Sequence, residues 1–301
     1  MKQLFVFILL FAFTAANAQD STRHIPISAA IKSNLVKVEA TGLGGFCGKV
    51  LNLSITNNST NKLTIDVDAG TLFQAQDEAY QNLLCLGGES LTLNAGEKKD
   101  TTVQTYCANL TRHAPTKGLK FTFWKKADSS LTGMLKFARK NKIPHPLIQY
   151  GTWCYTDNNC VNTVYHHDYY VQSKQLSGYI AKNKKIADPK YYVENKLEGR
   201  AGGPPVNAKN AKIVLLFTWG YEGYRHMYLV IRKADGSVYR KIESGWEMNN
   251  DEISATIEFD PNKDPAGSYT VQLYDENHHV KQERKIFISK DPWEMYRHQN
   301  D

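Results

Sequence analysis

The chain contains 301 residues with a formal net charge of +7 at pH 7 and 42% hydrophobic residues, a size that favours two domains over one small core. Its lysines and arginines are spread along the sequence with only short clusters such as 182–185, which argues against a surface for nucleic acid or anionic glycan. Beyond the N-terminal segment, no stretch is long and apolar enough to predict a transmembrane helix.

Residues 1–18 have the pattern of a secretory signal peptide. Lys2 supplies the positive start, and the apolar run at 4–13 is shorter than the roughly 20 residues that a membrane-spanning helix needs. The small residues Ala16 and Ala18 form a cleavage pattern, so we expect the mature chain to begin at Gln19. Lys2 is the only charged residue of the segment, and its removal lowers the net charge from +7 to +6. We therefore expect an exported protein, located in the periplasm, at the cell surface or outside the cell.

Short runs of alternating apolar and polar residues predict β-strands throughout a first domain at 24–198. The clearest run is 49–55, in which Leu51, Leu53 and Ile55 share one face. Turns recur about every eight to twelve residues, which is typical of a sandwich or a barrel, and we expect a β-sandwich. The predicted strands lie at 35–40, 49–55, 63–67, 71–73, 83–86, 90–93, 101–106 and 119–124.

A change of period predicts a small helical insert within this domain. Asp128 or Ser129 can cap its start, and Pro144 prevents its continuation. A weaker pattern predicts a second helix at 173–184. The apolar face of the first helix follows the spacing i, i+3, i+4 and i+7 and consists of Leu131, Met134, Leu135 and Ala138.

The densest cluster of glycine and proline, at 199–206, predicts a linker. Alternation returns after it, and we expect an immunoglobulin-like β-sandwich at 207–290 followed by a tail at 291–301. The predicted fold class is therefore mainly β. The strands expected in the second domain lie at 212–218, 227–231, 238–242, 253–259, 268–273 and 284–289.

The five cysteines all lie in the mature chain, and export would place them in a compartment where disulfides form. Cys154 and Cys160 are separated by a turn-like segment and are candidates for one disulfide, with Cys47 and Cys85 for another. This pairing leaves Cys107 as a free thiol, but the sequence equally permits other pairings. Neither a Cys-x-x-Cys motif nor the Cys/His spacing of a zinc site is present.

Common catalytic motifs are missing: the sequence contains no Gly-x-Ser-x-Gly, no phosphate-binding loop and no His-Glu-x-x-His. His166, His167 and Asp168 are adjacent, but neighbouring histidines on a strand point to opposite faces. We therefore expect no metal and no cofactor. His278 and His279 are predicted to lie in a hairpin loop.

One further pattern suggests covalent chemistry. A Tyr-Cys pair ending at Cys107 closes a strand, a helical insert follows, and Gln149 stands four residues before Trp153. Over about 45–160, this arrangement resembles the thioester domains of bacterial surface adhesins, although Gly151 and Thr152 replace the alanine and β-branched aliphatic residue of that family. The resemblance implies that Cys107 attacks the Gln149 amide and expels ammonia, forming a thioester that a partner's nucleophile can open. The alternative is that Cys107 is an ordinary buried or disulfide-bonded cysteine and Gln149 an ordinary hydrogen-bonding residue.

As a whole, the chain resembles exported two-domain β-proteins of the Bacteroidota type, a likeness that implies no activity. The function we favour is non-enzymatic binding of a cell-surface protein or glycan. The first alternative is a covalent adhesin with the Cys107–Gln149 thioester. The second is a hydrolase whose site is assembled from distant loops.

Overall fold

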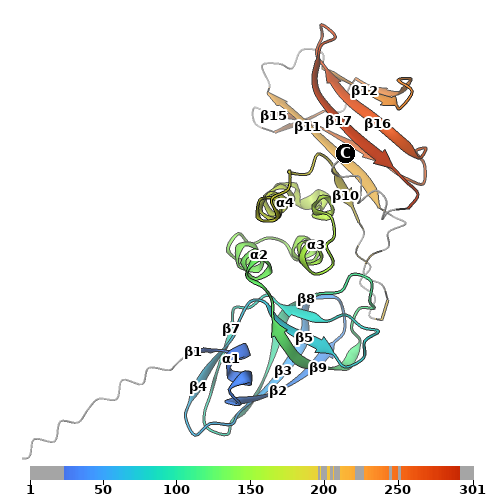
Figure 1. Cartoon of the computed structure of the whole chain (residues 1–301). Helices are drawn as coiled ribbons and strands as arrows, with labels where there is room; N and C mark the ends of the chain where they lie inside the picture. Colours follow the sequence, from blue (N-terminus) through green and yellow to red (C-terminus); the bar gives the residue numbers. More distant parts are fainter. Residues whose placement is uncertain are drawn as a thin grey trace, which may run out of the picture.

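The computed structural model describes residues 24–195, 197, 202–203, 206, 211–220, 227–243, 246–249 and 252–291. The predicted signal peptide lies outside these residues, as do most of the predicted linker and all but the first residue of the predicted tail. The described chain forms three layers, with a β-barrel, a layer of helices and a second β-structure stacked in that order (Figure 1). Strands outnumber helices, so the predicted mainly β fold class is confirmed.

Six strands of the N-terminal half close into a barrel in place of the expected sandwich. The barrel closes because the last strand, β9, pairs with both β2 and β5 and leaves no edge strand. A Cβ atom on Gly42 would lie 2.8 Å from the Thr116 carbonyl oxygen, so glycine permits the close approach of backbone where β2 meets β9. The order around the barrel is β2 (Val36–Leu43), β3 (Cys47–Asn57), β8 (Lys98–Cys107), β6 (Leu83–Cys85), β5 (Thr71–Ala75) and β9 (Lys117–Lys126).

A small sheet and a short helix flank the barrel. The sheet has three strands, and its central strand pairs in parallel with one neighbour and antiparallel with the other. It has the order β1 (His24–Pro26), β4 (Leu63–Val67) and β7 (Glu89–Leu93), and the helix is α1 (Ile27–Lys32).

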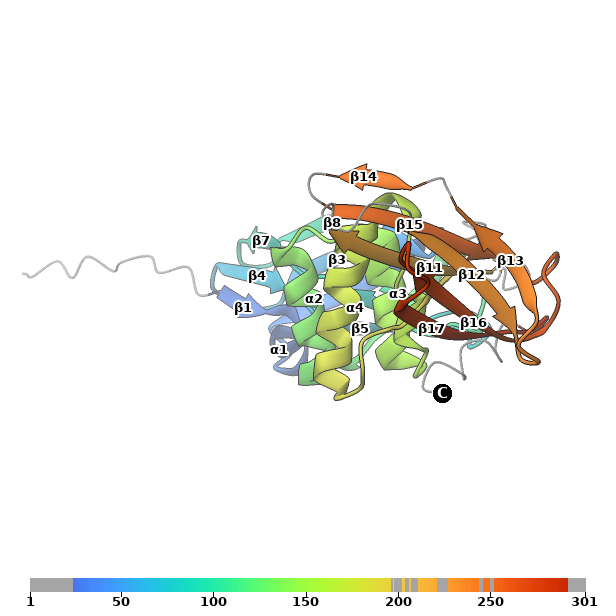
Figure 2. The same cartoon turned by 90° about the horizontal axis from the view of Figure 1, so that it is seen from above.

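The helical layer contains the predicted helix α2 (Ser129–Lys140), with Asp128 at its N-cap and with the predicted apolar face buried. The second predicted helix is present as α4 (Tyr170–Lys184) and begins three residues earlier than expected. Between them lies an unpredicted helix, α3 (His145–Thr156). The three helices run side by side across the barrel (Figure 2). Two short 3₁₀ helices, η1 (Val161–Thr163) and η2 (His167–Tyr169), connect α3 to α4.

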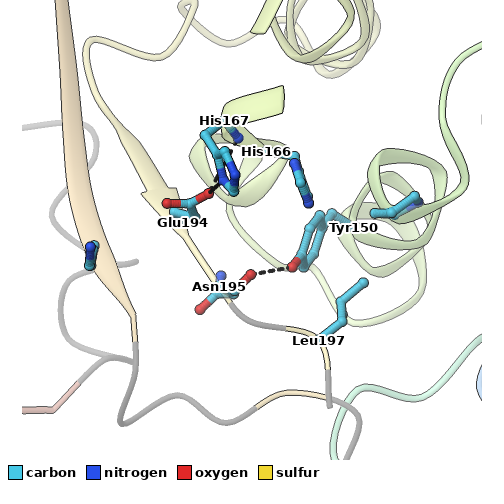
Figure 3. Close-up of a pocket in the computed structure, with 8 residues that line it drawn as sticks. Tyr150, His166, His167, Glu194, Asn195 and Leu197 are labelled. Atoms are coloured by element: carbon cyan, nitrogen blue, oxygen red, sulfur yellow. Dashed lines mark hydrogen bonds and ion pairs between the residues drawn. The ribbon is translucent and has the colours of Figure 1, made fainter. Parts of the chain in front are cut away.

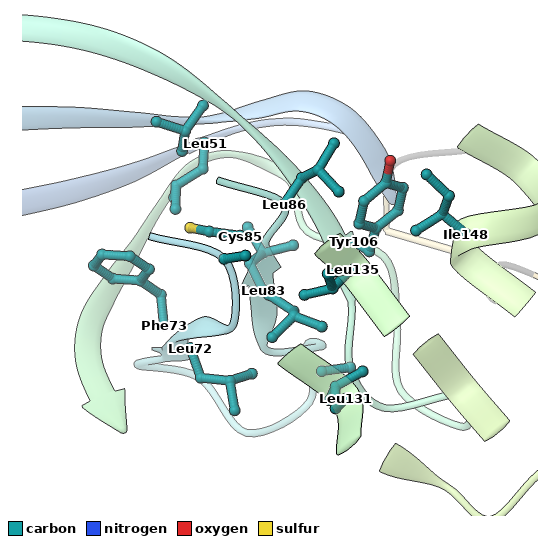
Figure 4. Packing of buried hydrophobic residues seen from close by; sticks show 14 of the residues in the cluster. Leu51, Leu72, Phe73, Leu83, Cys85, Leu86, Tyr106, Leu131, Leu135 and Ile148 are labelled. Atoms are coloured by element: carbon teal, nitrogen blue, oxygen red, sulfur yellow. The ribbon is translucent and has the colours of Figure 1, made fainter. Parts of the chain in front are cut away.

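Helix α3 lies at the centre of the molecule, and all of its residues from 147 to 154 are buried. A Cβ atom on Gly151 would lie 3.2 Å from Ile180 Cδ1 and 3.3 Å from Leu176 Cδ2, so glycine lets α3 pack tightly against α4. Ile148 of the same helix lies beside Tyr106 of the barrel (Figure 4). One hydrophobic core therefore joins the barrel and the helices.

The C-terminal half consists of two antiparallel four-stranded sheets that share a second, separate core, which includes Phe217, Leu229 and Phe259. The immunoglobulin-like assignment of this sandwich stays a prediction. One sheet has the order β10 (Tyr192–Glu194), β11 (Lys212–Gly220), β15 (Glu252–Phe259) and β14 (Glu247–Asn249). The other has the order β13 (Val238–Ile242), β12 (Tyr228–Lys233), β16 (Gly267–Tyr274) and β17 (Val280–Ile288).

Strand β10 connects the second core to the helical layer. It precedes the predicted linker in the sequence, yet it pairs antiparallel with β11, with Tyr192 opposite Val214. Tyr192 also stacks on Tyr165 of the helical layer, with ring centroids 5.0 Å apart. None of the helices in the described residues is both long enough and apolar enough to cross a membrane.

Candidate functional site

The structure brings Cys107 and Gln149 into direct contact. Cys107 is the last residue of β8, and Gln149 lies in the second turn of α3. The Cys107 backbone N–H donates to Gln149 Oε1 at 2.9 Å, and Gln149 Nε2 donates to the Cys107 carbonyl oxygen at 2.8 Å. Both residues are fully buried. The glutamine amide is therefore held against the residue with which the sequence pattern pairs it.

Local packing explains why α3 presents Gln149 to this strand end. Pro146 stands in the first turn of the helix, where its missing N–H costs no intrahelical hydrogen bond. The next turns bury Tyr150 and Trp153, whose rings meet edge to face at 6.0 Å. In the middle of this apolar packing, the polar amide of Gln149 needs a hydrogen-bonding partner, and the backbone of Cys107 supplies both a donor and an acceptor.

The electrostatic surroundings keep this thiol neutral. Burial raises the pKa of the Cys107 thiol well above its usual value, because the thiolate would lose its hydration. Burial likewise raises the pKa of the neighbouring Tyr106 phenol. The Tyr106 hydroxyl lies 2.7 Å from Nδ1 of His145, an exposed residue at the start of α3. A titratable group with access to solvent is therefore linked to the residue next to the cysteine.

None of the five cysteines, all within the described residues, forms a disulfide in the structure. The candidate pair Cys47 and Cys85 is not formed because the two residues lie on opposite sides of β8, opposite Tyr106 and Thr105 respectively. Two strand spacings of about 4.8 Å separate them, which exceeds the roughly 7 Å between Cα atoms that a disulfide tolerates. Cys85 instead contributes its side chain to the barrel core (Figure 4).

The candidate pair Cys154 and Cys160 is not formed either, although the two residues are close. The Cys154 thiol points at the carbonyl oxygen of Cys160, with 3.6 Å between sulfur and oxygen. Residue Cys154 is fully buried near the end of α3, and burial raises its thiol pKa to about 12.

A second candidate site lies beside α3, in a cavity of about 530 Å³ between the helices and β10 (Figure 3). Tyr150 forms one wall, and its hydroxyl donates to the Asn195 carbonyl oxygen at 2.6 Å. Across the cavity, Nδ1 of His167 lies 2.5 Å from Glu194 Oε1. This hydrogen bond to the Glu194 carboxylate raises the pKa of His167 above its usual value.

The two histidines here are arranged differently from the prediction. They were expected on a strand that turns them apart, but His166 is the N-cap of η2 and His167 its first residue. Their rings stack with centroids 4.8 Å apart and planes inclined by 20°. Sequence reasoning missed the role of Glu194 entirely, since it follows His167 by 27 residues and no motif links them.

Comparisons with known proteins assign no relative from which an activity can be taken. No protein-family model matches the chain, and no curated protein matches it. Among solved structures, the chain is similar to β-glucosidase from Kluyveromyces marxianus, in complex with glucose and in a selenomethionine-labelled form, each with a TM-score of 0.18 and 10% identity. The match covers 79% of this chain and 44% of that enzyme, so this chain spans less than half of its length. A similarity at this level carries no argument about fold or activity.

Proposed function

We propose that this protein is an exported, non-enzymatic binding protein whose contact with its partner becomes covalent through a thioester between Cys107 and Gln149. The observation that carries the proposal is the pair of hydrogen bonds that hold the Gln149 amide on the Cys107 backbone, in a site closed to water. The predicted signal peptide supports an exported location, at the cell surface or in the periplasm.

The two hydrogen bonds between Gln149 and the Cys107 backbone favour formation of the bond. The Cys107 sulfur attacks Cδ of Gln149, the Cδ–Nε2 bond breaks, and the thiol proton leaves with the nitrogen as ammonia. Oε1 gains negative charge in the tetrahedral intermediate, and the Cys107 N–H already donates to this atom at 2.9 Å. Because both reactants are fixed in one folded chain, the reaction does not lose the entropy of bringing two molecules together.

The partner would be a molecule that presents a primary amine, such as a protein lysine. Its nitrogen attacks Cδ of Gln149 in the thioester, an amide forms, and the sulfur of Cys107 leaves and takes up a proton. The burial of both residues protects the thioester from hydrolysis until a partner displaces the covering side chains. The protein is consumed by this single reaction, which makes it a binding protein in place of an enzyme.

Intact-mass measurement on the mature chain, with a phosphine reductant, tests the proposal. The expected mass is about 17 Da below that of the sequence because ammonia is lost, and Cys107→Ala or Gln149→Ala should abolish the deficit. Cys85→Ala is the matched control, since Cys85 is also fully buried in the barrel and its removal should leave the deficit intact. Methylamine should convert the deficit into a gain of about 14 Da and release one thiol.

A wild-type mass equal to that of the sequence would refute the thioester. The remaining proposal is then non-covalent binding of a cell-surface protein or glycan, with the cavity beside Tyr150 as the contact site. A glycan array would test the carbohydrate form of that proposal, and no enrichment over a blank surface would exclude it.

A further inference from the structure

His166 and His167 line the cavity beside α3, and the exposed Asp168 lies against both of their rings; the thioester uses none of these three side chains. One potential ligand atom from each of His166, His167 and Asp168 lies within 4.8 Å of the others. Nε2 of His167 is 3.2 Å from Asp168 Oδ1, and Nδ1 of His166 is 3.7 Å from Asp168 Oδ2. A tetrahedral metal ion with bonds of about 2.1 Å separates its ligand atoms by roughly 3.4 Å. The side chains of His166, His167 and Asp168 are 27%, 64% and 62% exposed. They can therefore rotate until their ligand atoms reach the separation that the metal requires.

Glu194 sets the state of His167. Its carboxylate accepts from the ring at Nδ1, at 2.5 Å, and its Oε1 also lies 3.3 Å from the His167 backbone nitrogen. A proton held on Nδ1 by a carboxylate leaves Nε2 with a free lone pair directed away from Glu194. This is the arrangement in which a histidine in a protein usually binds a metal ion. Because Glu194 belongs to β10 and His167 to η2, two separate elements build the site.

The local charge favours a cation. Asp168, Glu194 and Glu258 all act electrostatically on the His167 ring. Lys212, which also lines the cavity, forms an ion pair with Glu258, with 3.0 Å between Nζ and Oε2. The three carboxylates and the one ammonium together carry a net charge of −2 around the two imidazoles.

We propose that His166, His167 and Asp168 bind one divalent transition-metal ion of the zinc class, with Glu194 as the carboxylate that orients His167. Two imidazoles with one carboxylate favour zinc over magnesium or calcium, which prefer oxygen ligands throughout. Three protein ligands leave a fourth position open, where a donor atom of a partner molecule completes the coordination. The site requires no thioester, and either proposal can fail without the other.

Titration of the tag-free mature chain with Zn²⁺ by calorimetry, and with Co²⁺ by visible absorption, tests the site. One equivalent should bind, and Co²⁺ should give the absorption of a tetrahedral site. The variants His167→Gln and Asp168→Asn should lose the binding. The variant Glu194→Gln should keep the stoichiometry and weaken the affinity roughly 10- to 100-fold, the usual effect of losing a carboxylate that supports a metal-binding histidine.

The chain contains a matched control in His278 and His279, a second adjacent pair in the β16–β17 turn, where His278 Nδ1 lies 2.6 Å from the Tyr228 hydroxyl. Replacing both with glutamine should leave the affinity unchanged. Thermal melts without metal should match the wild type for every variant used. The proposal is overturned if the wild type binds no Zn²⁺, if the His167 and Asp168 variants bind as tightly as the wild type, or if the His278/His279 variant loses the binding.

Discussion

Replacing Gln149 with leucine in a chain that already carries Cys107→Ala separates the structural role of the glutamine from its chemical one. The alanine removes the thiol and with it any thioester, but both hydrogen bonds of Gln149 go to the backbone of residue 107. They therefore persist in the Cys107→Ala chain. Leucine fills a similar volume and offers no donor or acceptor, so the second substitution measures these hydrogen bonds alone.

The magnitude follows from what each backbone group loses. The N–H of residue 107 retains the Phe46 carbonyl oxygen as an acceptor at 3.1 Å, so this loss costs about 0.5–1 kcal/mol. The carbonyl of residue 107 loses the Gln149 donor in a fully buried site, which costs about 1–3 kcal/mol. The free energy of unfolding of the barrel and its helices should fall by about 1.5–4 kcal/mol in total.

Urea denaturation followed by far-ultraviolet circular dichroism measures this loss, and Gln175→Leu in the same background is the control. Gln175 is an exposed glutamine on α4 whose Nε2 donates to Asn141 Oδ1 at 3.1 Å, so its replacement should change the unfolding free energy by less than about 0.5 kcal/mol. A Gln149 effect as small as that of Gln175 would refute the reasoning, because it would mean that the paired hydrogen bonds do not hold α3 against β8.

Three further outcomes follow from the structure. Asp128→Ala removes the cap of α2, in which Oδ1 of Asp128 accepts from the Leu131 N–H at 2.8 Å, and should lower the unfolding free energy by about 1 kcal/mol. Asp128→Asn should retain most of the stability that the cap contributes. Equal losses for the two variants in urea denaturation would exclude a capping role. Burial raises the pKa of Cys47 to about 11, so its thiolate fraction at pH 8 is about 0.001. Alkylation of Cys47 should therefore be more than 100-fold slower than alkylation of a peptide thiol, and its rate should rise about tenfold per pH unit up to pH 11. Mass spectrometry of labelled peptides measures this rate, and labelling as fast as a peptide thiol would contradict the prediction. Phe217→Ala opens a cavity in the second core, where this residue is fully buried, and should lower the stability of the C-terminal sandwich by about 3–5 kcal/mol. Amide exchange in β3 and β8 of the barrel should stay unchanged. Faster exchange in those two strands would show that the two cores unfold together.

The helices show which elements local pattern can predict. Helix α2 has one face on the core and one in water, so its apolar residues follow the helical period and its position was predicted correctly. Helix α3 has neighbours around almost its whole circumference, so its sequence has no polar face and no period to detect. The local signal for α3 was Pro146, because proline is common in the first turn of a helix.

The candidate site was predicted in part. The Tyr-Cys strand end and the Gln-x-x-x-Trp spacing led to Cys107 and Gln149, and the structure places these residues in contact. The candidate Cys47–Cys85 disulfide is not formed in the structure because β8 lies between the two strands that carry these residues. Composition and spacing contain no information about that order.

The sequence by itself determined the alternation that makes strands, the mainly β class, and the period and cap of α2, since each depends on residues close together in the chain. Tertiary structure alone decided that β9 closes a barrel, that β10 pairs with β11 in a sheet of the C-terminal half, and that Glu194 reaches His167. These contacts join residues many positions apart. Their formation depends on how whole faces pack against one another, which no local pattern encodes.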